Sequence, residues 1–171
     1  MPIPATARPA RTRLAARPVD RVGRRPAGHL ARELSAVTGR RRAVVLLADL
    51  TNGAELDRHV EGPALRGIDG DALLALVLPS RPTVCDAARL HEPSLRRLAE
   101  QWHSSRLLVA PCTFGHLLVG LAVVALATST DAPLVERAAR PLADRFATGV
   151  VGTRLLANAR DGDSRAFSIG A

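Results

Sequence analysis

Two cysteines, Cys85 and Cys112, are the residues of this sequence best suited to covalent or redox chemistry. A thiolate can attack a sulfoxide or a disulfide, and a second cysteine can then resolve the intermediate. The two cysteines are far apart in the sequence, and neither belongs to a Cys-x-x-Cys motif. Isolated cysteines are also common as small buried hydrophobic residues. The sequence therefore leaves two interpretations open, a reactive pair and two structural thiols.

Histidines could bind a metal or haem, and the chain has five: His29, His59, His91, His103 and His116. No two of them have the i,i+4 spacing that places two ligands on one face of a helix. An unpaired histidine is usually an ordinary surface or core group. The sequence therefore predicts no metal site, although His91 and His103 flank a predicted helix where a ligand could reach them.

Three further residues could hold a small ligand: Asp86, Trp102 and Arg106. Asp86 and Arg106 could be polar anchors, and Trp102 is the one indole of the chain. An aspartate that ends a strand can instead cap the turn that follows it. Both roles stay open for Asp86.

The segment 107–127, LLVAPCTFGHLLVGLAVVALA, contains no charged residue and is long enough to cross a membrane as a helix. Pro111, Gly115 and His116 interrupt its first half, which disfavours a continuous helix. The parts on each side of Gly115 are rich in leucine and valine. The segment therefore predicts a β-hairpin whose loop contains Gly115.

The charge of the chain is unevenly distributed. The net charge is +8, yet residues 1–26 hold seven arginines and one aspartate, so the rest of the chain is close to neutral. This N-terminal part has no apolar periodicity and predicts a disordered Arg/Pro/Ala-rich tail. We expect no membrane association and no nucleic-acid binding beyond a weak contact by this tail. No secretory signal precedes the domain, which predicts a cytoplasmic protein.

The remaining sequence alternates helices and short strands. Leu30, Leu34 and Val37 share one helical face, and Gly39 is the expected stop. The predicted strands that follow are 42–49, 54–62, after an Asn-Gly turn, and 83–88, and the predicted helices begin near Gly70 and Pro93. A long last helix is expected to pack along Val135, Ala138, Leu142, Phe146, Val150 and Leu155.

Residues 78–126 resemble the GAF domain family. The matching features are a turn at Ser80, Arg81 and Pro82, a strand with Val84 that ends at Asp86, a strand with Ser105, Leu107, Val109 and Pro111, and a returning Gly120-Leu121. The resemblance implies an α+β fold, GAF-like and PAS-related, with a central antiparallel sheet of five to six strands, helices packed on it and a long C-terminal helix. The implied domain covers 27–158, followed by a flexible tail at 159–171.

The resemblance also implies a function. GAF domains are chiefly non-catalytic sensory or regulatory modules that bind a small molecule between sheet and helices. They pass a signal through their terminal helices to an output protein such as a kinase, a cyclase or a transcription regulator. The expected partners are therefore an unidentified small molecule, a separate output protein and a second copy docked through the first and last helices. The candidate pocket residues are Cys85, Asp86, Trp102, His103, Arg106 and Cys112.

An enzymatic alternative exists within the same family. Free methionine sulfoxide reductases are small GAF proteins that use clustered cysteines, but this chain lacks the cysteine-rich loop before SSRLLVAP. The family topology places Cys85 opposite the start of the strand 106–111 and Cys112 after its far end. A disulfide needs Cα atoms within about 7 Å, so we expect the two thiols to be out of bonding range.

Overall fold

The structure is a computed structural model that describes residues 24–76 and 80–167. Its strands are β1 (Ala43–Ala48), β2 (Glu55–Glu61), β3 (Thr83–Asp86), β4 (Arg106–Phe114) and β5 (Leu117–Leu126). Its helices are α1 (Arg24–Thr38), α2 (Gly70–Leu74), α3 (Pro93–Gln101) and α4 (Ala132–Phe167), with a short 3-10 turn, η2, at Ala87–Arg89.

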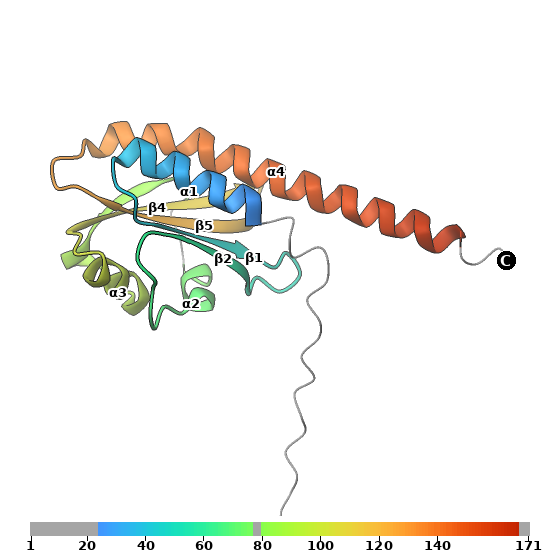
Figure 1. Ribbon diagram of the computed structural model, residues 1–171, viewed down its shortest axis with the longest axis horizontal. Helices are drawn as coiled ribbons and strands as arrows, with labels where there is room; N and C mark the ends of the chain where they lie inside the picture. The colour runs from blue at the N-terminus through green and yellow to red at the C-terminus, as the bar shows by residue number, and fades with distance from the viewer. Residues whose placement is uncertain (1–23, 77–79, 168–171) are drawn as a thin grey trace, which may run out of the picture.

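The described residues form three layers. The strands make one antiparallel sheet in the order β2-β1-β5-β4-β3. Helices α1 and α4 cover one face of this sheet, and α2 and α3 lie against the other (Figure 1). This arrangement confirms the predicted α+β class and the predicted long C-terminal helix.

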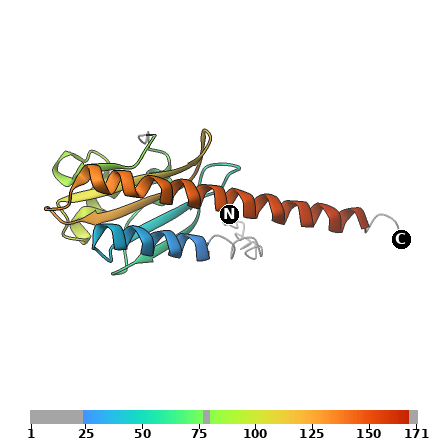
Figure 2. The ribbon, with the colours of Figure 1, turned by 90° about the horizontal axis from the view of Figure 1, so that it is seen from above.

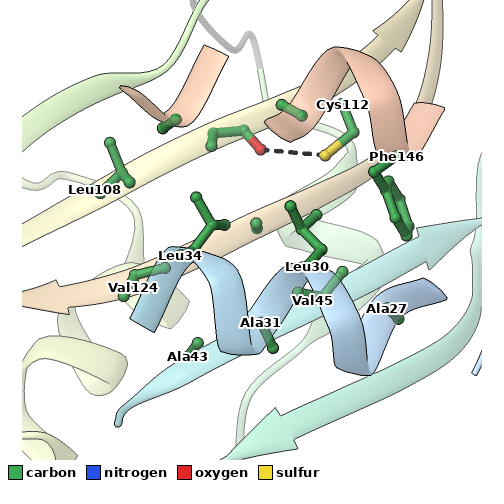
Figure 3. Packing of buried hydrophobic residues seen from close by; sticks show 14 of the residues in the cluster. Ala27, Leu30, Ala31, Leu34, Ala43, Val45, Leu108, Cys112, Val124 and Phe146 are labelled. Carbon is green, nitrogen blue, oxygen red and sulfur yellow. Dashed lines mark hydrogen bonds between the residues drawn. The ribbon is translucent and has the colours of Figure 1, made fainter. Parts of the chain in front are cut away.

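The central strands β1, β5 and β4 are buried on both faces. Every residue of β1 is buried, and so are most residues of β4 and β5. Alternate residues of a strand point to opposite sides, so each strand contributes to two cores. One core lies under α1 and α4 and includes Leu34, Val45 and Val124 (Figure 3). The other lies under α2 and α3 and includes Leu46, Leu98 and Trp102.

The uncharged segment 107–127 forms the predicted hairpin. Strands β4 and β5 pair from Arg106↔Leu126 to Phe114↔Leu117, with Gly115 and His116 in the turn. Gly115 has φ 61° at the first turn position, where a two-residue II′ hairpin requires a positive φ. The strands reach closer to the turn than predicted, so Cys112 lies within β4. None of the helices described is long and apolar enough to cross a membrane.

Several local details differ from the sequence prediction. Helix α1 begins at Arg24, before the predicted domain start at residue 27, and ends before Gly39, whose φ of 67° supports the predicted stop. Residues 1–23 of the predicted tail lie outside the described residues. Val37 is 37% exposed, because only part of the predicted helical face reaches the sheet. Helix α2 begins at Gly70 as predicted, and the carboxylate of Asp69 caps it.

Helix α4 is longer than predicted and packs over a shorter stretch. It continues to Phe167, into the stretch predicted as a tail from residue 159, and 168–171 lie outside the described residues. Figures 1 and 2 show its C-terminal part projecting beyond the sheet. Leu155 was expected on the packed stripe, but it is 64% exposed because it lies on this projecting part.

Helix α4 packs on the sheet where Gly120 has no side chain. A Cβ at Gly120 would lie 2.5 Å from the carbonyl oxygen of Leu46 and 3.3 Å from the ring of Phe146. Gly120 therefore allows β1 to approach from one side and Phe146 of α4 to cover the strand from above. This close approach explains why the Gly120-Leu121 pair, which resembles the GAF family, needs a glycine at position 120.

We expect Gly120→Ala to lower the free energy of unfolding by about 1–3 kcal/mol, the usual cost of overpacking a core. Urea denaturation followed by circular dichroism measures this change. The matched control is Gly149→Ala, since a Cβ at Gly149 meets nothing within 4 Å. It should leave stability unchanged or raise it, because alanine favours helix. Equal stabilities for Gly120→Ala and the parent protein would contradict this account.

Candidate functional site

Asp86 and Arg106 face each other at one end of the sheet. They are register partners on β3 and β4, and Arg106 Nε lies 3.7 Å from Asp86 Oδ1. The Arg106 guanidinium also donates to the carbonyl oxygens of Thr130 (2.9 Å) and Thr128 (3.3 Å). Arg106 thus ties the loop before α4 to the sheet. The Asp86 side chain makes no capping hydrogen bond to η2, so the alternative role of turn cap is wrong.

His103 lines a shallow, open cleft beside this ion pair. The cleft lies at the C-terminal end of α3, and its lining is charged and small: Ala87, Arg96, Ala99, Glu100, His103 and Ser104. His103 has φ 47°, an uncommon conformation for a residue with a side chain. His91 is exposed and does not line the cleft. No group of histidine, cysteine and carboxylate side chains in the described ranges could hold a metal ion.

Trp102 lies in the core under α2 and α3 and is fully buried. Its backbone carbonyl accepts a hydrogen bond from the Arg42 guanidinium. Its indole Nε1 is the one buried side-chain nitrogen or oxygen without a hydrogen-bond partner among the described residues. A buried donor without an acceptor costs free energy, so it marks a place where a ligand oxygen or a water would be stabilised.

Cys85 and Cys112 lie on opposite faces of the sheet. Cys85 pairs with Leu107 and packs against the core under α2 and α3, whereas Cys112 is buried under α1 and α4 (Figure 3). Cys112 is five residues beyond Leu107 on β4, an offset of about 16 Å. The prediction that the thiols are out of bonding range is confirmed. The prediction that both line one pocket is wrong, because the strand pleat turns them to opposite sides.

The surroundings of both thiols disfavour the thiolate. Burial raises the pKa of Cys112 to about 12, and the charge of Asp144 adds to the effect. Burial also raises the pKa of Cys85, with contributions from Asp86 and Glu136. A thiol must be deprotonated to act as a nucleophile. Neither cysteine therefore has the environment that thiol-redox chemistry needs.

Two residues near the candidate site had not been predicted. Arg42 bonds to Trp102, and the Gln101 side chain bonds to the backbone of Arg66. Both contacts join segments distant in sequence, and neither residue belongs to a periodic pattern or a motif. The sequence carries no signal that would have singled them out.

The chain has a GAF-like fold, as comparison with solved structures shows. The blue-light-absorbing form of the PixJ GAF domain of Thermosynechococcus elongatus matches with a TM-score of 0.60 and 13% identity, over 86% of this chain and 96% of that one. A domain assigned to a two-component sensor histidine kinase protein of Sinorhizobium meliloti matches with a TM-score of 0.53 and 14% identity, over 78% and 94%. A phycoerythrobilin-bound GAF domain from a cyanobacterial phytochrome gives 0.50 and 14%, over 82% and 98%.

Comparison of the sequence with known families and proteins gave no match. No protein-family model matches the chain, and no curated protein matches it. At these low identities the solved structures support the fold alone.

The composition of the chain makes the buried thiol measurable. It contains neither lysine nor tyrosine, so above pH 9 its cysteines are the side chains that titrate before arginine. The folded state holds the Cys112 proton to about pH 12, whereas the unfolded state releases it near 9. The unfolded state therefore binds fewer protons in this window, and stability must fall as pH rises.

We expect the free energy of unfolding to decrease by about 1 kcal/mol per pH unit between pH 9.5 and 11. Urea denaturation across this range measures the slope. Cys112→Ala should reduce the slope to the part that Cys85 contributes, and Cys85→Ala should leave most of it in place. A slope that survives in Cys112→Ala would contradict the assignment.

Proposed function

We propose that this chain is a non-catalytic sensory or regulatory module that works as a homodimer through α1 and α4 and passes its signal on through α4. The observation that carries the proposal is the C-terminal part of α4, which projects beyond the sheet (Figure 2). Its Leu155 and Leu156 side chains are exposed. A packed partner would bury this surface.

The exposed side chains follow a helix-pairing pattern. Leu134 and Leu155 are 61% and 64% exposed, and they are separated by a whole number of heptads, so they lie on one stripe of α4. Leu156 is 63% exposed and lies near Gly149 and Gly152, where an added Cβ would meet nothing within 4 Å. The two glycines leave room for a second helix to approach α4 closely.

A groove between α1 and α4 continues this surface. Its floor is apolar, with Leu142 and Phe146, and its wall contains the ion pair between Glu33 and Arg145. Figure 2 shows the two helices side by side on the outside of the sheet. A twofold dimer is the simplest closed assembly, and it places the same groove of both copies face to face.

The output partner is a separate protein, such as a kinase, a cyclase or a transcription regulator, and the module acts in the cytoplasm. The Sinorhizobium meliloti neighbour, a domain of a sensor histidine kinase protein, supports this class of partner. The projecting parts of two paired α4 helices would form a surface to which such a partner can bind.

A small molecule bound on the α2 and α3 side of the sheet is the second element of the proposal. The specific observation is the orphaned N–H of Trp102 in that core. Cys85 lies on the same side, and His103 lines the cleft at the end of α3. Asp86 and Arg106 pair with each other, and Arg106 bonds to the loop before α4 rather than into this core. Cys112 is on the opposite side of the sheet and does not belong to this site.

We expect sedimentation velocity to show a dimer for the parent protein and a shift toward monomer for Leu155→Glu, because a carboxylate would be buried against a second helix. Gly149→Leu should weaken the dimer as well. Gly149→Ala adds a single methyl group to the same position and should weaken the dimer less than Gly149→Leu. A parent protein that stays monomeric at high concentration would overturn the dimer.

Native mass spectrometry of the protein purified from cells tests the ligand. We expect the protein to retain a small molecule. The protein with this molecule bound should also melt at a higher temperature than the protein without it, since a ligand that binds only the folded state stabilises it. Trp102→Phe keeps the ring and removes the donor, so it should retain less of the molecule. Equal retention by this variant would exclude Trp102 as a ligand donor.

A further inference from the structure

The connection from β2 to α2 crosses the α2 and α3 side of the molecule as an extended segment. We name residues 62–69 the strap. Figure 1 shows this connection leaving β2, passing beside α3 and turning into α2. Its last residue, Asp69, caps α2 through a hydrogen bond to the backbone N–H of Ala72.

Side chains of α3 hold the strap by its backbone. Gln101 Oε1 accepts from the Arg66 N–H at 3.0 Å, and Gln101 Nε2 donates to the Arg66 carbonyl at 2.7 Å. Arg97 donates to the Gly67 carbonyl at 2.8 Å. These contacts are exposed to solvent, where hydrogen bonds exchange with water at little net cost. Breaking these three hydrogen bonds therefore costs little free energy.

The strap covers the core that contains Trp102. Ile68 is buried in this core at 8% exposure, and Leu65 packs against it half-buried. Trp102 belongs to the same core, directly after Gln101 in the chain, and its Nε1 has no acceptor among the described residues. Opening the strap would remove the cover provided by Leu65 and Ile68.

Two glycines of the strap adopt backbone conformations that other residues rarely adopt. Gly62 and Gly67 have φ of 107° and 63°, conformations that side chains rarely adopt. A Cβ at Gly62 would lie 2.6 Å from the Arg41 carbonyl oxygen, so the strap begins tight against the loop after α1. Gly67 lies at the clamped end, beside Arg97. The strap is thus held tightly at Gly62, whereas its contacts at Arg66 and Gly67 can be broken.

We propose that the strap is a gate that Gln101 and Arg97 hold closed, and that its release admits a small, mainly apolar molecule whose one hydrogen-bond acceptor pairs with Trp102 Nε1. The inference rests on the proposed binding of a ligand on this side of the sheet. It adds the route of entry and the chemical class of the ligand. Segments with few buried contacts open at lower cost than the whole domain.

Trp102 reports the gate directly, because it is the one tryptophan and the chain has no tyrosine. In Gln101→Ala we expect acrylamide to quench Trp102 fluorescence severalfold more effectively than in the parent protein. We also expect the Arg66 amide to exchange with deuterium about tenfold faster, because two hydrogen bonds are lost. Arg66→Ala is the matched control, since Gln101 binds only the backbone of this residue, and Glu100→Ala controls for the helix surface.

Thermal melting shows whether Gln101→Ala is folded. A second measurement needs no variant and uses the parent protein. Local opening is supported if the Arg66 and Ile68 amides exchange much faster than the amides of β5, and if low concentrations of denaturant do not change their exchange rate. Unchanged quenching and exchange in folded Gln101→Ala would overturn the gate. Exchange of the strap only at the rate of β5 would overturn it too, while leaving the dimer untouched.

Cyclohexanone and methylcyclohexane test the ligand class, because one carries an acceptor and the other does not. Saturation-transfer NMR should show stronger binding of the ketone, strengthened further in Gln101→Ala and reduced to the level of the hydrocarbon in Trp102→Phe. No preference for the ketone would overturn the pairing with Trp102. Ketone binding that is identical in Gln101→Ala and the parent protein would show that the strap does not control entry.

Discussion

The two-sided burial of β1, β5 and β4 is the constraint on which the rest of the structure depends. Because these strands are apolar at almost every position, both faces must be covered, and helices from both ends of the chain are needed to do so. Helices α1 and α4 close one core, and α2, α3 and the strap close the other. The sheet therefore separates a core under α1 and α4 from a core under α2, α3 and the strap, and the two cores share no side chain among the residues that the structure describes.

The elements were predictable because local signals decide them. Gly115 specifies the hairpin turn, Gly39 the end of α1 and Asn52-Gly53 the turn before the edge strand. The candidate site was predicted less well, because its geometry depends on which face each strand residue occupies. Cys112 and Val109 are close in sequence, yet they point into different cores. Leu155 has an apolar neighbourhood in sequence but lies past the edge of the sheet, and no periodicity reveals where a sheet ends.

The enclosed side is held by polar contacts between segments distant in sequence. Gln101 and Arg97 bind the strap, and Arg58 pairs with Glu55 while also donating to the Ile68 carbonyl. The backbone N–H of Glu55 in turn donates to the Asp71 carboxylate in α2. The strap, the start of β2 and the N-terminus of α2 thus form one hydrogen-bonded unit. A displacement of the strap would therefore change the hydrogen bonds at the start of β2, next to the β1–β2 turn.

That turn is also where α4 leaves the domain. Arg154 donates to the carbonyl of Ala48, the last residue of β1, at 3.1 Å, and burial lowers the pKa of its guanidinium, which remains charged. Earlier along α4, Phe146 rests on Gly120, and Glu136 accepts the Val84 N–H of β3. Besides packing on β4, helix α4 is therefore held to β3, β5 and the end of β1 by these contacts. Because packed elements move between discrete arrangements rather than deform freely, the Arg154 contact links the position of the end of β1 to that of the part of α4 beside it.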